Sequence, residues 1–198
     1  IYKIAGLKEV GAKILAVDSN PMAKPLTPDH WELGPGLRID VGVQFQPSPA
    51  GKTIRHGTGA KQAPLVRFVQ EKGKAKTRQP AANLTLPPNP ISIPDLKKAE
   101  TLNFVFEWSA GLAPQKGHHK GHKAPSFWAI NRVPWQGMSA GKRPPPLATL
   151  KQGKSYIFEL ENRTPNQHPI HLHGLFFRVD SSNQKKIVPH FADTVLLD

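Results

Sequence analysis

Three histidines lie within six residues of one another in NQHPIHLHG, the stretch from Asn166 to Gly174. They are His168, His171 and His173, in a chain that has nine histidines in all. Imidazole is a ligand for copper, zinc, iron and nickel alike, so the spacing does not choose the metal. A lone histidine is more often a hydrogen-bonded core or surface residue. Three at this spacing favour a metal site over a structural role.

The spacing also predicts how the three rings are divided. Side chains in a β-strand alternate between two faces, so His171 and His173 would share one face and His168 would lie on the other. Pro169 cannot donate a ladder hydrogen bond and therefore permits a local bend. Gly174 would let the backbone approach a neighbouring group closely. One segment can thus aim two imidazoles at one centre and the third at another.

Two other groups of residues could assist or compete in metal binding. Asn166 and Gln167 precede the cluster and are candidates for hydrogen bonds that fix the tautomer of a ligating ring. The insert KGHHKGH holds His118, His119 and His122, and histidine-rich tracts can bind metal. Its lysines disfavour cation binding, so a solvated basic loop is the favoured interpretation of the insert.

The segments that must position these residues have the pattern of short strands. The 21 prolines and 16 glycines disfavour long helices, and no segment has a convincing helical period. TPDHWELGPG is expected to form a turn because of its threonine, prolines and glycines. The predicted fold class is all-β, a sandwich or barrel. The predicted strands are IYKIAGL, AKILAVDSNP, LRIDVGVQFQP, PLVRFVQ, TLNFVFEW, FWAINRVPW, SYIFELENR, HLHGLFFRVD and ADTVLLD.

Composition divides the chain and excludes several function classes. The proline-rich stretch that contains LPPNPISIPDL predicts an extended linker over residues 79–98, between a block at 1–78 and a block at 99–198. The absence of cysteine excludes disulfides, thiolate metal sites and cysteine nucleophiles within this sequence. No run approaches the roughly 18 apolar residues of a membrane helix, and no secretory leader is visible.

The net charge of +13 raises a nucleic-acid or anionic-surface interpretation. The basic residues are spread over both halves of the chain. The densest run, KGKAKTR, has no aromatic side chains on which bases could stack. We therefore expect these basic residues to lie in solvated loops or at strand edges and not to bind nucleic acid. A nucleic-acid binder would show an affinity for DNA that depends steeply on the salt concentration.

Several motifs together resemble the laccase-like multicopper oxidases. NRTPNQHPIHLHGLFF is similar to the HPxHLHG copper motif of that family, FWAINRVPW to its INGxxW segment, and FADTVLLD to its DTV strand. LAVDSNPMAKPLTPDHWELGPGLRIDV resembles a stretch of the family's middle domain, with Pro35, Gly36, Arg38 and Asp40 in place. The resemblance implies cupredoxin-like Greek-key β-sandwiches: the later part of a middle domain, then an incomplete C-terminal domain.

The resemblance also implies roles for individual residues. His168 matches a type 1 copper ligand, His171 a type 2 ligand and His173 a type 3 ligand. Asp193, in the DTV segment, matches an acidic residue that can help to position or deprotonate a substrate. The implied reaction takes single electrons from a phenol, an aromatic amine or a metal ion at type 1 copper. It reduces dioxygen to water at a trinuclear copper cluster, in a periplasmic or secreted enzyme.

The departures from the family pattern lead to a further expectation. The family's HCHxxxH motif is absent, and with it the type 1 thiolate, a second type 1 histidine and two type 3 ligands. We therefore expect this chain to be a fragment of a longer oxidase, inactive without the remainder of that polypeptide. The alternative is a non-enzymatic copper-binding or assembly module in which His168, His171 and His173 hold one metal.

Overall fold

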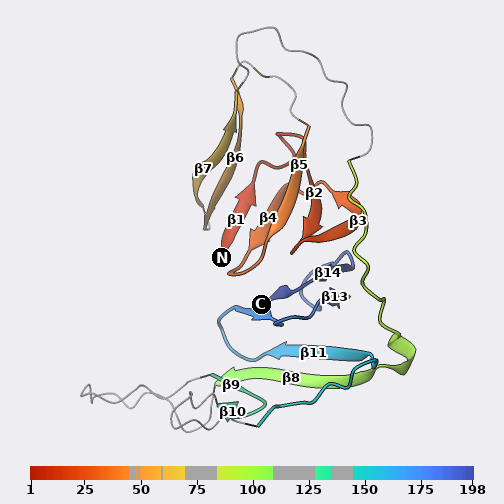
Figure 1. The fold of residues 1–198 in the computed structure, drawn as a ribbon. Coiled ribbons are helices and arrows are strands. Elements are labelled where there is room, and N and C mark those ends of the chain that lie inside the picture. Colours follow the sequence, from red (N-terminus) through yellow and green to blue (C-terminus); the bar gives the residue numbers. More distant parts are fainter. Residues whose placement is uncertain (45–47, 49, 59, 70–83, 109–127, 135–144) are drawn as a thin grey trace, which may run out of the picture. The chain divides into compact units, whose positions relative to one another are not determined.

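The computed structural model describes residues 1–198 except 45–47, 49, 59, 70–83, 109–127 and 135–144 (Figure 1). The chain divides into two compact units. The first combines Ile1–Pro90 with Pro169–Leu196, and the second combines Ile91–His168 with Leu197–Asp198. Within the described part, no helix is long and apolar enough to cross a membrane.

Two sheets from the first half of the sequence make up most of the first unit (Figure 1). One has the order β4-β1-β6-β7, and the other has the order β3-β2-β5. The strands are β1 (Tyr2–Ala5), β2 (Ala12–Val17), β3 (Asn20–Leu26), β4 (His30–Leu33), β5 (Ile39–Val43), β6 (Lys52–Thr58) and β7 (Lys61–Phe68).

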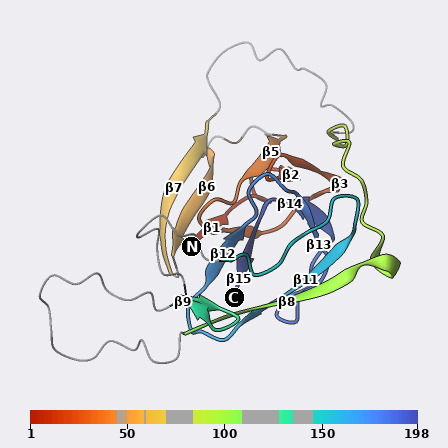
Figure 2. The same ribbon diagram turned by 60° about the horizontal axis from the view of Figure 1, so that its bottom comes forward.

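The core of the first unit consists of two apolar clusters. One is centred on Leu7 and Val10 and includes residues of β1, β2 and β6. The other joins Ile14 and Val17 of β2 to Ala192 of β14 (His190–Ala192). The antiparallel pair of β13 (Phe177–Val179) and β14 therefore packs against β2 and β3, as Figure 2 shows. This packing brings the residues that follow the histidine cluster into the first unit.

A two-residue turn connects β2 to β3. Val17 pairs with Asn20, and the turn residues Asp18 and Ser19 both have positive φ, 47° and 62°. Positive φ at both central residues is the signature of a type I′ turn, whose twist matches that of the flanking strands. Aspartate is one of the few residues besides glycine that tolerate this conformation. The turn fixes the direction of the Asp18 side chain, which is buried.

A four-stranded sheet of order β10-β9-β8-β11 forms the second unit. The strands are β8 (Glu100–Trp108), β9 (Trp128–Ile130), β10 (Val133–Pro134) and β11 (Tyr156–Asn162), and β11 runs parallel to β8. A second turn with two positive φ values, at Asn131 and Arg132, joins β9 to β10. A 3-10 helix (Leu96–Lys98) capped by Asp95 precedes β8. The remaining strands, β12 (His168–His171) and β15 (Thr194–Leu197), pair with each other.

The all-β fold class is confirmed, but the strand predictions missed three strands. TPDHWELGPG forms the predicted turn only at Pro35 and Gly36, and it also contains β4, because Trp31 and Leu33 pack against the first core cluster. β6 was missed because KTIRHGT has little hydrophobic alternation, and β3 because it contains Pro21 and Pro25. Prolines are tolerated in β3 because it lies at a sheet edge, where a ladder donor is dispensable.

The proline-rich segment has no regular strand between residues 84 and 95, as an extended linker would. Asn89 nevertheless ties it to the β2–β3 turn, because its amide donates to the Ser19 carbonyl (3.0 Å) and to Asn20 Oδ1 (3.1 Å). The domain boundaries at 78/79 and 98/99 stay a prediction.

Candidate metal centre

The histidine segment is a short strand followed by a turn, not one continuous strand as HLHGLFFRVD predicted. β12 ends at His171, and His173 lies in the turn that follows. The rings of His171 and His173 are 4.7 Å apart between centroids, at 77° to each other. A Cβ on Gly174 would meet none of the described atoms within 4 Å. Glycine is therefore favoured at position 174 because the backbone has a positive φ of 74°, and not because another part of the backbone approaches closely.

Three oxygen atoms surround Nδ1 of His171. The Asp193 carbonyl and Thr194 Oγ1 each lie 3.0 Å away, and Asp193 Oδ1 lies 3.4 Å away. A carbonyl oxygen can only accept, so Nδ1 carries the proton and donates it. Thr194 Oγ1 in turn donates to Asp193 Oδ1 at 2.7 Å. In the neutral ring, the lone pair of His171 is consequently on Nε2, and 40% of the side chain is exposed.

His168 uses the opposite ring nitrogen. Its Nε2 lies 2.8 Å from Thr164 Oγ1, which also lies 2.8 Å from Asn162 Oδ1. The hydrogen bond to Thr164 occupies Nε2 and leaves Nδ1 as the nitrogen that a metal could use. Phe106 stacks on the ring at 6.0 Å between centroids, and Trp128 meets it edge-on at 4.7 Å. Burial among these groups lowers the pKa of His168, because it disfavours the charged ring.

This shift predicts a pH-dependent stability of the metal-free protein. Because the folded-state pKa of His168 lies below the ordinary 6.5, the unfolded chain takes up the proton first as the pH falls. The stabilisation from His168 is complete above about pH 6.5 and is lost as the pH falls from there through the folded-state pKa. His168→Gln should therefore flatten the dependence of the free energy of unfolding on pH in this interval. Denaturant titrations at several pH values test this, and parallel curves would contradict it.

Asp193 joins the histidine pair to an arginine. Arg38 Nη2 lies 2.5 Å from Asp193 Oδ2, and Arg38 Nη1 donates to the Gly36 carbonyl at 2.6 Å. Burial is the largest single influence on the Asp193 carboxyl and would raise its pKa. The hydrogen bonds from Arg38 and Thr194 and the nearby positive charges outweigh it, so the pKa of Asp193 is lowered. The carboxylate is consequently ionised and already engaged.

Asp18 is a buried carboxylate that binds backbone N–H groups of two segments. Its Oδ1 accepts from Arg38 N at 2.9 Å, and its Oδ2 accepts from Asp193 N at 3.2 Å and from Thr194 N at 3.1 Å. The side chain is 0% exposed, and Arg38 Nη1 lies 3.8 Å away. Asp18 therefore connects the β2–β3 turn to the backbone that accepts the His171 proton.

The other candidates from the sequence have different partners. Gln167 donates to Asp198 Oδ1 at 2.6 Å, and the Asn166 backbone bonds to Asn162 and Thr164. Within the described residues, no hydrogen bond joins either side chain to a histidine ring. The insert with His118, His119 and His122 lies outside the described residues. Among those that are described, no three His, Asp, Glu or Cys side chains converge on one metal-sized point.

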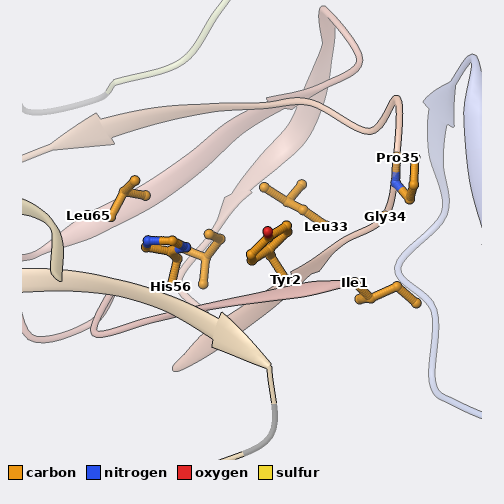
Figure 3. A pocket seen from close by; sticks show the side chains of 8 residues that line it. Ile1, Tyr2, Leu33, Gly34, Pro35, His56 and Leu65 are labelled. Carbon is orange, nitrogen blue, oxygen red and sulfur yellow. The ribbon is translucent and has the colours of Figure 1, made fainter. Parts of the chain in front are cut away.

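A cavity of about 370 Å³ lies elsewhere in the first unit (Figure 3). It is lined mainly by apolar side chains, including Tyr2, Leu33 and Leu65, and its imidazole, His56, lies 5.6 Å from the Tyr2 ring between centroids. It contains no carboxylate and none of the clustered histidines. The cavity is therefore not part of the candidate metal centre.

Sequence reasoning did not identify Asp18, Thr164 or Thr194 as parts of this arrangement. A signal existed for Thr164, because the turn-forming residues Pro165 and Asn166 between it and His168 can bring the hydroxyl back to the ring. No local signal existed for Asp18, which is 176 residues from Thr194 along the chain.

Residues 109–197 match the family described as multicopper oxidase. A crystal structure of a multi-copper oxidase from Pseudomonas thermotolerans is similar to this chain, with 35% identity and a TM-score of 0.70 over 99% of it. Lac15, from a marine microbial metagenome, shares the fold at 24% identity, with a TM-score of 0.63 over 100% of this chain. The chain spans 42% of the length of each of these structures. A comparison with curated proteins gives no match.

Proposed function

This chain belongs to the multicopper oxidase family, and from that premise we propose that it is part of a laccase-like oxidase. The enzyme would take electrons singly from a small reductant and reduce dioxygen to water. The observation that carries the proposal is that two neighbouring histidines on β12 use opposite ring nitrogens in their hydrogen bonds. Nε2 of His168 contacts Thr164, and Nδ1 of His171 contacts Asp193. This arrangement leaves Nδ1 of His168 and Nε2 of His171 for metal binding and fits a segment that serves two copper sites.

The proposed ligands follow from these contacts. His168 would bind type 1 copper through Nδ1, His171 would bind type 2 copper through Nε2, and His173 would bind a type 3 copper beside it. Bound copper would supply one-electron transfer at the type 1 site and dioxygen reduction at the other sites. The cupredoxin-like fold supports this assignment. The sequence holds no cysteine, so the type 1 thiolate would come from outside these 198 residues.

Asp193 is proposed to position groups and not to remove a proton from the substrate. Its carboxylate accepts hydrogen bonds from Arg38 and Thr194, and its lowered pKa makes it a weak base near neutral pH. We therefore propose that the oxidation of the reductant does not depend on proton transfer to Asp193. Phenols, aromatic amines and reduced metal ions remain the proposed substrate classes, and the proposed location is periplasmic or extracellular.

The test uses the full translation product of the gene, purified and loaded with copper. We expect a blue thiolate absorbance, a separate type 2 copper resonance and oxygen uptake on addition of a phenol, an aromatic amine or Cu(I). Tight binding of copper without the blue absorbance and without oxygen uptake would support the copper-binding module instead. Absence of copper binding would exclude both functions.

A further inference from the structure

We propose that Asp18, with Arg38 as a second arm, is a positioning residue that fixes the tautomer of His171. The inference rests on the proposed function only in taking Nε2 of His171 as the atom that binds copper. Neither Asp18 nor Arg38 belongs to the histidine segment. Both act through the backbone and side chains of Asp193 and Thr194.

The first step is that Asp18 fixes the backbone of residues 193 and 194 by hydrogen bonds. One carboxylate oxygen accepts from both Asp193 N and Thr194 N, while the other accepts from Arg38 N. Hydrogen bonds to a charged acceptor are stronger than those between neutral groups, and the carboxylate is 0% exposed. Because the type I′ turn sets the direction of Asp18, the position of the peptide units that it binds is set by the β2–β3 hairpin.

The second step is that the positioned backbone and hydroxyl acceptors determine which nitrogen of the His171 imidazole carries the proton. Asp193 and Thr194, whose backbone N–H groups bind Asp18, also supply the two acceptors of His171. The Asp193 carbonyl and Thr194 Oγ1 each lie 3.0 Å from His171 Nδ1. Arg38 holds the Asp193 carboxylate, and this carboxylate accepts the hydroxyl proton of Thr194. The Thr194 oxygen consequently offers a lone pair to the ring. All the acceptors therefore favour a proton on Nδ1 and leave Nε2 available to a metal.

A purely structural role for Asp18 makes a different prediction. If the carboxylate only joins β2 to β14 and β15, its removal should lower stability and leave the imidazole tautomer unchanged in the molecules that still fold. If it positions His171, the proportion of the two tautomers should change even in fully folded protein. The ¹⁵N chemical shifts of the imidazole distinguish these outcomes without any metal present.

The experiment compares wild type, Asp18→Asn and Asp40→Asn in the full translation product. Asparagine tolerates the left-handed turn conformation, so Asp18→Asn keeps the hairpin but puts an amide where one oxygen accepted. Asp40 is exposed and lies two residues from Arg38, so its variant controls for the loss of one charge. Spectra of the copper-free proteins are recorded at about pH 9, well above the ordinary imidazole pKa of about 6.5.

We expect Nδ1–H to dominate at His171 in wild type and in Asp40→Asn, and a clear rise of the Nε2–H form in Asp18→Asn. Copper affinity at His171 should fall about 10- to 100-fold in Asp18→Asn, as for other groups that orient a ligating histidine. Unchanged tautomer populations in folded Asp18→Asn would overturn the inference. If that variant does not fold, Arg38→Gln, at a half-exposed position, must show a smaller rise of the same form, and no rise would overturn it. If wild type binds no copper at His171, the proposed function fails. The tautomer comparison still tests whether Asp18 fixes the position of the proton on His171.

Discussion

Replacing His171 by alanine is expected to lower kcat for dioxygen reduction about 100-fold or more in the copper-loaded full translation product. Residues that only orient a ligating histidine cost about 10- to 100-fold when they are changed, so loss of the ligand itself should cost at least as much. The type 2 copper resonance should disappear. The blue absorbance should remain, because His168 has its own partners, Thr164, Phe106 and Trp128. Steady-state oxygen uptake and electron paramagnetic resonance on the same samples measure both effects.

His190→Ala is the matched control. His190 lies in β14, and its Nδ1 is hydrogen-bonded to the Val188 carbonyl at 2.8 Å, outside the cluster. This variant should keep both copper signals and nearly the wild-type kcat. An His171→Ala enzyme with normal turnover and an intact type 2 signal would refute the ligand assignment.

The second large effect is expected for stability, in Asp18→Ala. Removal of the carboxylate leaves the backbone N–H groups of Arg38, Asp193 and Thr194 without their acceptor. A buried donor without a partner costs about 1–3 kcal/mol, whereas Arg38 is half-exposed and keeps Asp193 as its ion-pair partner. We therefore expect the free energy of unfolding to fall by about 3 kcal/mol, measured by denaturant titration of the copper-free protein.

Asp29→Ala provides the comparison for this measurement. Asp29 pairs with Lys8 at 3.7 Å, and both side chains are largely exposed, so its removal should change stability by less than about 1 kcal/mol. Equal effects of the two alanine variants would show that the Asp18 hydrogen bonds contribute little. The link between the β2–β3 turn and the segment around Thr194 would then rest on the apolar packing of Ala192 against Ile14 and Val17.

The sequence was sufficient to find the histidine cluster because its chemistry is local. Imidazoles at a spacing of three and two residues indicate a metal site whatever surrounds them, and the motif around them carries the family resemblance. The alternation of faces also predicted that His171 and His173 lie together, and the two ring centroids are 4.7 Å apart. Strand alternation does not explain this proximity fully, because His173 lies in a turn beyond the end of β12.

The parts that could not be predicted depend on distant contacts. Asp18 looked like the end of a strand, and nothing near it in sequence announces partners 175 and 176 residues away. β4 was hidden by turn-forming residues and exists because Trp31 and Leu33 pack into the core. Arg38 was noticed only as part of a family motif, whereas its contact with Asp193 came from the structure.

Anomalous diffraction at the copper absorption edge, from crystals of the copper-loaded full translation product, would show whether His168 and His171 bind different copper ions. We expect one copper beside Nδ1 of His168, and separate copper peaks beside Nε2 of His171 and beside His173. A single copper shared by the three rings, or copper peaks that touch none of them, would contradict this expectation.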